Sequence, residues 1–392
     1  MTDVVITGAV RTAIGTFGGS LAAIPPAELA ARCVAEALKR ARTAPEAVGH
    51  VVLGNVIPTE PRDAYIARVA AIEGGVPKEV PALTVNRLCG SGLQAIVSAA
   101  QAIMLGDAEV AVAGGAESMS RSPHLLKTGR FGQRMGDAAL VDYMVGVLND
   151  PFGHGHMGVT AENVAERYGI SRTMQDDFAA ESQVRAARAI REGRFRDQIL
   201  PVEVQRKRET VAFDTDEHPK ATSAEDLAKL RPAFSKTGSV TAGNASGLND
   251  GAAIVVLAGA PAAERDGSRP LARIVGYAHA GVDPSEMGMG PVPAVQRLLE
   301  RTGLRAADFD VIESNEAFAA QACAVSRALD LDPDKVNVNG GAIALGHPLG
   351  ATGAIVTVKA LYELARVNGR YGLVTMCIGG GQGIAMAIER LH

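Results

Sequence analysis

Short apolar runs alternate with amphipathic stretches along the first third of the chain. The segments Asp3–Thr7, His50–Ile57 and Ala82–Val85 are short and apolar, which is typical of buried strands. Pro26–Ala41 and Gly90–Leu105 carry apolar residues at helical spacing, and the first of these begins with a proline, which suits a first helical turn. Strands that alternate with helices in this way predict an α/β fold with parallel strands.

The pattern changes in the middle of the chain and then returns. Residues 119–248 are richer in Arg, Asp, Glu, His and Met than the preceding part. We predict helices there at Thr160–Tyr168, with Thr160 as its cap, and at Ser171–Glu192. The apolar strand pattern resumes at Asn249. We therefore expect an inserted loop lobe at 119–248.

The parts on either side of this lobe form two halves that repeat one order of motifs. We assign 1–118 and 249–269 to an N-terminal half and 270–392 to a C-terminal half. In the first, a strand leads to CGSG, a long apolar helix, the strand Glu109–Ala113 and a glycine pair. In the second, the predicted strand VNVNGG leads to HPLGATG, the helix Ala354–Ala365, the strand YGLVTM and CIGGG.

This weak duplication places Cys89 and His347 at equivalent turns between a strand and a helix. Two such halves packed back to back would bring the two turns together, although they lie far apart in the chain. We therefore expect both residues at one site.

Composition and charge exclude several classes of protein. The 392 residues are 47% hydrophobic and 21% charged, which is ordinary for a globular protein with a sizeable core. The net charge of −4 gives no reason to expect nucleic-acid or membrane-surface partners. The start of the chain does not resemble a secretory signal, and no unbroken apolar run approaches the ~20 residues of a membrane helix.

The chain has four cysteines, at positions 33, 89, 323 and 377. None forms a C-x-x-C pair or lies near a histidine at metal-ligand spacing, so we expect no metal site. A disulfide framework is not expected in so long a chain, and a reduced, cytoplasmic protein is the prediction.

Cys89 directly precedes a predicted helix. The free N–H groups and partial positive charge of a helix N-terminus favour the thiolate, so we expect a lowered pKa and a nucleophile. A small buried structural cysteine fits the position equally well. GSGLQA also matches the G-x-G-x-x-A dinucleotide fingerprint, but Asn86 and Arg87 are unusual in a central strand of that fold, and a lone match is weak.

His347 and Cys377 also lie in glycine-rich segments. His347 is flanked by glycines and followed by Pro348, which exposes its ring to a ligand. Cys377 ends an apolar strand and precedes Gly379–Gly381, whose N–H groups can face an oxyanion. Either residue alone is equally compatible with a structural role. The two cysteines and the histidine together indicate an active site.

Four motifs in this order resemble the thiolase family of acyl-CoA acyltransferases: NRLCGSGLQAI, SNEAFAAQ, NVNGGAIALGHPLGATGA and CIGGGQGIA. The resemblance extends from VRTAIGTFGG to the last strand, and GHMGVTAENVA and TAGNASGLNDGAA are similar to the bacterial biosynthetic acetyl-CoA acetyltransferase branch. It implies two duplicated βαβαβαββ-type halves, stacked as α-β-α-β-α layers, with an inserted loop lobe. It also implies a homotetramer, built as a dimer of dimers.

The resemblance implies a role for each matching catalytic residue. Cys89 would take an acyl group from coenzyme A after His347 has deprotonated it. Cys377 would remove a proton from the methyl group of a second acetyl-CoA. Asn315 would hold a water that forms one oxyanion hole with His347, while the N–H groups of Cys89 and Gly379 would form the other.

Coenzyme A is by this resemblance a substrate and product, and no cofactor is expected. The inserted lobe would hold it, with Lys220 in the place of an arginine usual in relatives near the adenosine end. Met157 and Met287 are flexible side chains that suit an adaptable acyl pocket. The residues implied along the pantetheine path are His156, Met157, Phe234, Ala242, Ser246, Leu248, Ala317 and Phe318.

The implied reaction is the reversible condensation of two acyl-CoA molecules to a 3-ketoacyl-CoA and free coenzyme A. A degradative 3-ketoacyl-CoA thiolase and a non-catalytic lipid carrier of the same fold remain alternatives. The segment VIPTEPRDAYIARVAA resembles broad-range β-ketothiolases of polyhydroxyalkanoate-forming bacteria, so propionyl-CoA is a further expected substrate.

Overall fold

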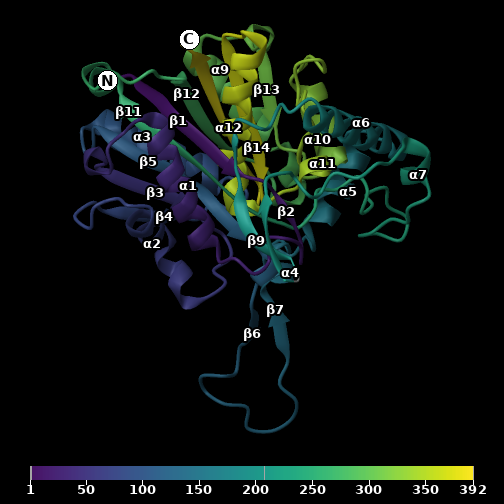
Figure 1. The fold of residues 1–392 in the computed structure, drawn as a ribbon. Coiled ribbons are helices and arrows are strands. Elements are labelled where there is room, and N and C mark those ends of the chain that lie inside the picture. The colour runs from purple at the N-terminus through teal and green to yellow at the C-terminus, as the bar shows by residue number, and fades with distance from the viewer. Residues whose placement is uncertain (1, 207, 392) are drawn as a thin grey trace.

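The computed structural model describes residues 2–206 and 208–391 (Figure 1). Its largest sheet has 11 strands, whose main path runs β13-β14-β15-β12-β1-β11-β5-β3-β4. The strands on this path are β1 (Val4–Thr12), β3 (His50–Gly54), β4 (Ala82–Val85), β5 (Val110–Ser118), β11 (Asn249–Gly259), β12 (Ala272–Gly281), β13 (Val311–Ser314), β14 (Tyr371–Ile378) and β15 (Gln382–Arg390).

The sheet consists of two half-sheets joined by a narrow seam. At the seam, β1 and β12 pair only through Val5 with Arg273 and Ile6 with Ala272. Short strands β2 (Gly15–Thr16) and β8 (Ile199–Leu200) extend the N-terminal half-sheet alongside β11 and β1.

The two half-sheets repeat one pairing scheme, which confirms the predicted duplication. In the first, β3 runs parallel to β4 and β5, and β5 is antiparallel to β11, which is antiparallel to β1. In the second, β13 is parallel to β14, which is antiparallel to β15, itself antiparallel to β12. A single bridge from Val336 to Ile312 takes the place of β4.

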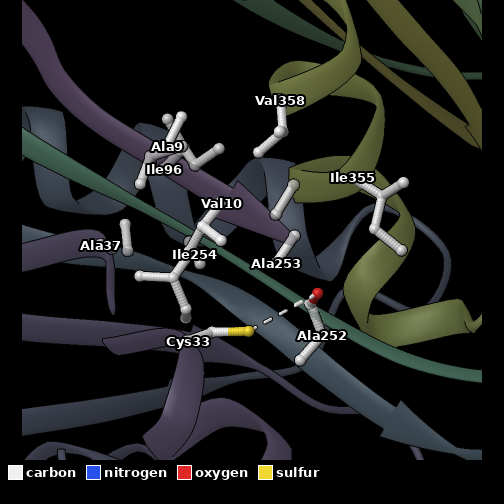
Figure 2. Packing of buried hydrophobic residues seen from close by; sticks show 14 of the residues in the cluster. Ala9, Val10, Cys33, Ala37, Ile96, Ala252, Ala253, Ile254, Ile355 and Val358 are labelled. Carbon is white, nitrogen blue, oxygen red and sulfur yellow. Dashed lines mark hydrogen bonds between the residues drawn. The ribbon is translucent and has the colours of Figure 1, made fainter. Parts of the chain in front are cut away.

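Helices cover the half-sheets in the predicted layers. Helices α3 (Ser91–Leu105) and α12 (Leu349–Val367) pack against each other between the half-sheets. Helices α1 (Pro26–Ala41) and α2 (Ile66–Glu73) cover the outer face of one, and α9 (Pro291–Thr302) covers the other. In Figure 2, Cys33 and Ala37 of α1 and Ile355 and Val358 of α12 lie around β1 and β11, in a core of small and branched side chains.

Glycines allow the two central helices to touch at their first turns. A Cβ atom at Gly92 would lie 2.8 Å from the backbone nitrogen of Ala354, and one at Gly353 would collide with Leu93. The glycines of GSG and GATG are therefore needed for close helix packing. This contact brings the turns that carry Cys89 and His347 together.

The inserted lobe leaves the N-terminal half between β5 and β11, where the C-terminal half has only the turn Gly379–Gly381 between β14 and β15. Part of it, the β6–β7 arm (residues 124–142), projects from the body of the protein (Figure 1). The lobe contains β6 (His124–Leu126), β7 (Leu140–Asp142), α4 (Tyr143–Val147), α5 (Met157–Arg167), α6 (Arg172–Arg191), β9 (Val202–Arg206), β10 (Glu209–Phe213) and α7 (Ala224–Ala228).

The remaining helices connect these parts. They are α8 (Ala260–Arg265), α10 (Ala319–Ala328) and α11 (Ala342–Leu345).

The structure corrects several predicted element boundaries. Helix α5 begins at Met157 with His156 as its cap, so the prediction of a Thr160 cap is wrong. The Thr160 hydroxyl instead donates to the Met157 carbonyl inside the helix. Gly114 and Gly115 do not end β5, because both pair with β11, and a Cβ at Gly114 would collide with the carbonyl of Ala253.

Two further corrections concern the C-terminal half. VNVNGG forms no strand and contributes only the Val336 bridge. Helix α12 begins at Leu349, five residues earlier than predicted, directly after His347 and Pro348. The start of a helix therefore adjoins the histidine.

Within the described residues, the segment Leu88–Leu105 is long and apolar enough to cross a membrane. However, 61% of it is buried inside the protein, as is usual for the core helix of a folded domain. Polar residues interrupt this segment, which is why no unbroken apolar run was expected there.

Candidate active site

One apolar cavity of about 410 Å³ lies where the first turns of α3 and α12 meet the turn after β14. Cys89, His347, Cys377 and Gly379 all line it. The start of α3 packs tightly against the end of β14, since a Cβ atom at Gly90 would lie 2.5 Å from Cδ1 of Ile378. The structure thus brings together residues from both halves of the chain, as predicted from the duplicated turns.

The thiol of Cys89 is protonated in the resting site. Burial raises its pKa to about 11, while the Gly379 and Cys89 N–H groups facing the sulfur lower it, and the buried Glu117 carboxyl raises it. The predicted lowering of this pKa is therefore wrong: desolvation outweighs the N–H groups at the start of α3. Reaction at this sulfur needs a base.

Cys377 lies at the end of β14 and is fully buried. It pairs in register with Gly383 of β15. Burial raises the pKa of its thiol, and the nearby Cys89 sulfur raises it too. Once deprotonated, a thiolate in this position would be a strong base.

His347 is held through its backbone and through one ring nitrogen. Its N–H donates to Oδ1 of Asn249 at 2.9 Å, and Nδ1 lies 2.6 Å from Oγ1 of Thr352. Nε2 is buried and has no hydrogen-bond partner in the described part of the chain. Burial lowers the pKa of His347 to about 4, so the ring is neutral at neutral pH. A neutral ring can accept a proton.

Asn315 follows β13 and is 1% exposed. Its backbone N–H donates to the carbonyl of Thr375 on β14. Neither its Oδ1 nor its Nδ2 has a partner among residues 2–206 and 208–391. Asn315 does not line the cavity itself. Since buried amides in proteins are normally satisfied, this side chain is suited to binding a water.

An aromatic stack forms one wall of the cavity. The His156 ring lies parallel to Phe234, with 4.7 Å between the ring centroids, and Phe234 meets Phe318 edge to face at 6.2 Å. Nδ1 of His156 also accepts the Gly158 N–H, which fixes the ring at the start of α5. The residues expected along the pantetheine path all line the cavity, as does Met287, which was expected at the acyl pocket. The pantetheine residues are His156, Met157, Phe234, Ala242, Ser246, Leu248, Ala317 and Phe318.

Lys220 is the exception among the expected contacts. It does not line the cavity, and its backbone N–H donates to Oε1 of Gln183. The structure gives no contact between Lys220 and the other candidate residues of the cavity.

Sequence reasoning missed the apolar wall next to Cys89. Several of these side chains belong to α4 and the segment after it, where the only signal was a short apolar run, YMVGVL, within a polar lobe. The missed residues on the cavity wall are Leu88, Met119, Met144, Val145, Val147, Leu148, Ala233, Ala245, Gly247 and Leu349.

Glu117 was also missed, although it links the two halves behind the site. Its buried carboxyl accepts the N–H groups of Val56, Ile57 and Gly350 and the side-chain amide of Asn55. Burial raises the pKa of Glu117 to about 8. Because Gly350 is in the first turn of α12, this carboxyl connects β5 to the turn that follows His347.

The segment that resembled broad-range relatives does not contact the cavity. Residues 61–65 form a short 3₁₀ helix, and the Asp63 carboxyl accepts the Thr59 and Glu60 N–H groups at its start. Tyr65 is 67% exposed. Within this chain, the segment therefore cannot select substrates by direct contact.

Comparison with known families agrees with this fold. The family model described as "Thiolase, N-terminal domain" matches residues 4–260, and "Thiolase, C-terminal domain" matches residues 268–390. The chain therefore belongs to the thiolase family.

Two relatives are similar to the chain over almost its entire length. The chain is 64% identical over 391 residues to "Beta-ketothiolase BktB" of Cupriavidus necator, with 99% of both chains covered. It is 54% identical over 393 residues to "Acetyl-CoA acetyltransferase" of the same organism, with 100% of both covered.

Two solved structures superpose closely on the chain. Acetyl-CoA acetyltransferase from Bacillus anthracis matches with a TM-score of 0.97 at 51% identity, covering 100% of this chain and 99% of that one. Human mitochondrial 3-ketoacyl-CoA thiolase matches with a TM-score of 0.97 at 46% identity and the same coverage.

Proposed function

We propose that the protein is a thiolase that condenses two acyl-CoA molecules, reversibly, to a 3-ketoacyl-CoA and free coenzyme A. One observation carries this proposal: a half-buried cysteine, a buried cysteine and a neutral histidine, whose Nε2 has no partner among the described residues, line a single apolar cavity. This set can form a thioester on one sulfur and remove a carbon-bound proton with the other. Membership of the thiolase family supports the same reaction.

In the first step Cys89 attacks the acyl-CoA carbonyl. Nε2 of His347 takes the thiol proton, which is needed because burial holds the pKa of Cys89 at about 11. The sulfur–carbonyl bond forms, and the bond to the coenzyme A sulfur breaks. Cys377 gives its proton to the departing coenzyme A thiolate. The N–H groups of Cys89 and Gly379 are assigned to the developing oxyanion.

In the second step the Cys377 thiolate removes a proton from the α-carbon of a second acyl-CoA. Its raised pKa makes it a strong base. His347 and a water on Asn315 are assigned to the enolate oxygen. The enolate carbon attacks the thioester on Cys89, and the released Cys89 sulfur recovers its proton from His347. The protons are thereby restored, and no resident cofactor is needed.

Acetylation of Cys89 tests this assignment directly. Incubation with acetyl-CoA alone should add one acetyl group to the protein, located on Cys89 by peptide mass spectrometry. Cys89→Ser should lose most activity, because a hydroxyl is a far weaker nucleophile near neutral pH. The matched control is Cys323→Ser, since Cys323 lies outside the cavity. Full activity in Cys89→Ser, or acetyl found only on Cys377, would contradict the proposal.

The coenzyme A path is assigned to the inserted lobe, residues 119–248, together with the loop after Asn315. The stacked rings of His156 and Phe234 and the small side chains of Ala242 and Ser246 leave room for a slender chain. Lys220, which does not line the cavity, is assigned to the adenosine end of coenzyme A. The division of the chain into the lobe and two halves at 118, 248 and 269 is part of this proposal.

The proposed substrates include propionyl-CoA as well as acetyl-CoA. The cavity wall contains four methionines, at positions 119, 144, 157 and 287, whose unbranched side chains adapt to different neighbours. The greater identity to a β-ketothiolase than to an acetyl-CoA acetyltransferase of the same organism supports a broad range. A degradative 3-ketoacyl-CoA thiolase would use the same site, and the human structure keeps that alternative open.

A lipid carrier of this fold is disfavoured. Carrying a lipid requires an apolar cavity but none of Cys89, His347 and Cys377, which all face this one. Reduced thiols are required for the chemistry, and this supports a cytoplasmic location.

The proposed assembly is a homotetramer built from two dimers. Strand β4 lies at one end of the sheet and leaves an edge open to pairing, and the side chain of Leu83 in this strand is 45% exposed. The β6–β7 arm exposes large apolar side chains, including Phe131 at 92% and Met135 at 90%. Exposed apolar groups on a projecting arm are typical of an interface. We assign the edge to the dimer and the arm to the tetramer.

A further inference from the structure

The His347 ring has a hydrogen-bond partner on one side only. Nδ1 lies 2.6 Å from Oγ1 of Thr352, while Nε2 has no partner in the described part of the chain. The ring and Thr352 are both almost fully buried, at 4% and 2% exposure. A neutral imidazole carries one proton, on either nitrogen, and only the other nitrogen can accept the thiol proton of Cys89.

A second contact of Thr352 decides between the two possibilities. Oγ1 of Thr352 lies 2.9 Å from the carbonyl oxygen of Pro348. If the hydroxyl proton pointed at Nδ1, these two oxygens would face each other with no hydrogen between them. If Nδ1–H donates to Oγ1, the hydroxyl proton is free to point at Pro348, and both short contacts are hydrogen bonds.

We propose that Thr352 is a positioning residue that keeps the proton of the neutral His347 ring on Nδ1 and so leaves Nε2 free as the base. This inference rests on the proposed role of His347 as the group that deprotonates Cys89. Thr352 touches neither substrate nor sulfur in this arrangement; it acts through the ring.

The local backbone makes this arrangement rigid. Helix α12 begins directly after His347 and Pro348, so Thr352 is in its first turn. From there its hydroxyl donates a hydrogen bond to the Pro348 carbonyl. On the other side, Oδ1 of Asn249 accepts the His347 N–H. The ring is therefore held between β11 and α12, with the hydroxyl of Thr352 beside Nδ1.

Substitution at Thr352 tests the proposal by kinetics. Thr352→Val keeps the shape and removes the hydroxyl, and we expect kcat for condensation to fall roughly 10-fold to 100-fold with KM nearly unchanged, because the Nδ1 proton loses its acceptor. Thr352→Ser restores the hydroxyl and should recover most of the loss.

Thr357→Val is the matched control on the same helix. Thr357 is also fully buried, and its hydroxyl donates to the carbonyl of Gly353 at 2.8 Å, but it does not touch the ring. Both variants lose the same kind of helix hydrogen bond. A loss in Thr357→Val equal to that in Thr352→Val would show a structural effect only and overturn the proposal.

The tautomer can also be measured directly in the wild-type protein, with a variant used only to assign the resonance. In wild-type protein labelled with ¹⁵N-histidine, the resonance that disappears in His347→Gln should show the proton on Nδ1. A proton on Nε2 in the wild type overturns the proposal. Failure of Cys89 to become acetylated would instead disprove the proposed function, and the tautomer would still be readable.

Discussion

At the scale of single residues, burial governs the protonation of the site. It keeps both cysteines as thiols and His347 as a neutral ring, so these three side chains are uncharged near neutral pH. In the proposed mechanism the reaction begins when a proton moves from Cys89 to His347. The two thiols share one environment but differ in their neighbours: the Gly379 N–H faces Cys89, while Cys377 ends a strand. This difference allows them different tasks.

Replacing Cys377 should separate the two steps. Cys377→Ala removes the proposed base for the α-proton but leaves Cys89 and His347. We expect acetylation of Cys89 by acetyl-CoA to survive, while condensation falls by ~10²–10⁴. Exchange of the methyl protons of acetyl-CoA in deuterated water, followed by mass spectrometry, should fall equally. Normal exchange in this variant, with Cys323→Ala as the control, would show that another group is the base.

Residues next to glycines could be found from the sequence, and their supporting partners could not. Cys89, His347 and Cys377 lie in motifs whose glycine spacing and family resemblance mark them. Thr352 lies in the same HPLGATG motif as His347, and Glu117 follows a glycine pair, but their roles could not be predicted because they depend on which atoms these side chains meet after folding. The direction in which the pKa of Cys89 shifts could not be predicted either, because the depth of burial is a property of the packed structure.

At the scale of elements, prediction succeeded where local signals and packing agree. Pro26–Ala41 and Ala82–Val85 were predicted with the bounds that the structure has. The prediction failed at Gly114–Gly115, because close pairing with β11 requires glycine there, and at α5, where a histidine caps the helix. The pairing of β5 with β11 could not be predicted from the sequence around the two glycines, and the capping role of His156 was not recognised from its position. Helix α4 was missed because it is short and follows the arm.

The missed helix α4 bears on the range of substrates. Met144 and Val147 of α4 and the adjacent Leu148 line the cavity with Cys89, so the wall near the acyl group is apolar and flexible. We expect kcat/KM for 3-ketovaleryl-CoA to be close to that for acetoacetyl-CoA, because an adaptable wall accommodates the extra methylene. A selective pocket would instead discriminate by ~1–3 kcal/mol, which is roughly 10-fold to 200-fold.

Thiolytic cleavage assays with both 3-ketoacyl-CoAs and free coenzyme A measure this ratio. A hundredfold preference for acetoacetyl-CoA would contradict the broad range and leave the thiolase assignment intact. A steady rise in kcat/KM with longer chains would favour the degradative alternative.

At the scale of the whole molecule, the β6–β7 arm determines the proposed assembly. The arm projects from the body of the protein (Figure 1), and its side chains Phe131 and Met135 are 92% and 90% exposed. The arm joins the rest of the protein at Asp142, which caps α4 on the cavity wall. The base of the arm is therefore connected through α4 to the wall of the cavity.

Charges on the arm should break the proposed tetramer. In the double variant Phe131→Asp, Met135→Asp, we expect light scattering to show two chains per particle in place of four, because carboxylates oppose burial in an apolar interface. Leu105→Asp is the control, since Leu105 is 78% exposed at the end of α3, away from the arm. A wild-type dimer, or an unchanged tetramer in the double variant, would refute the assigned role of the arm.

The position of the inserted lobe has a consequence for synthesis on the ribosome. Strand β5 leaves the ribosome early, but its neighbour β11 follows only after the entire lobe, so the inner edge of the N-terminal half-sheet stays open meanwhile. In the C-terminal half, β15 follows β14 after one turn. Folding of the first half is therefore slow and non-local, and the second half closes at once. Nascent chains that stall within the lobe would expose an unpaired apolar strand, and chaperone demand should be greatest there.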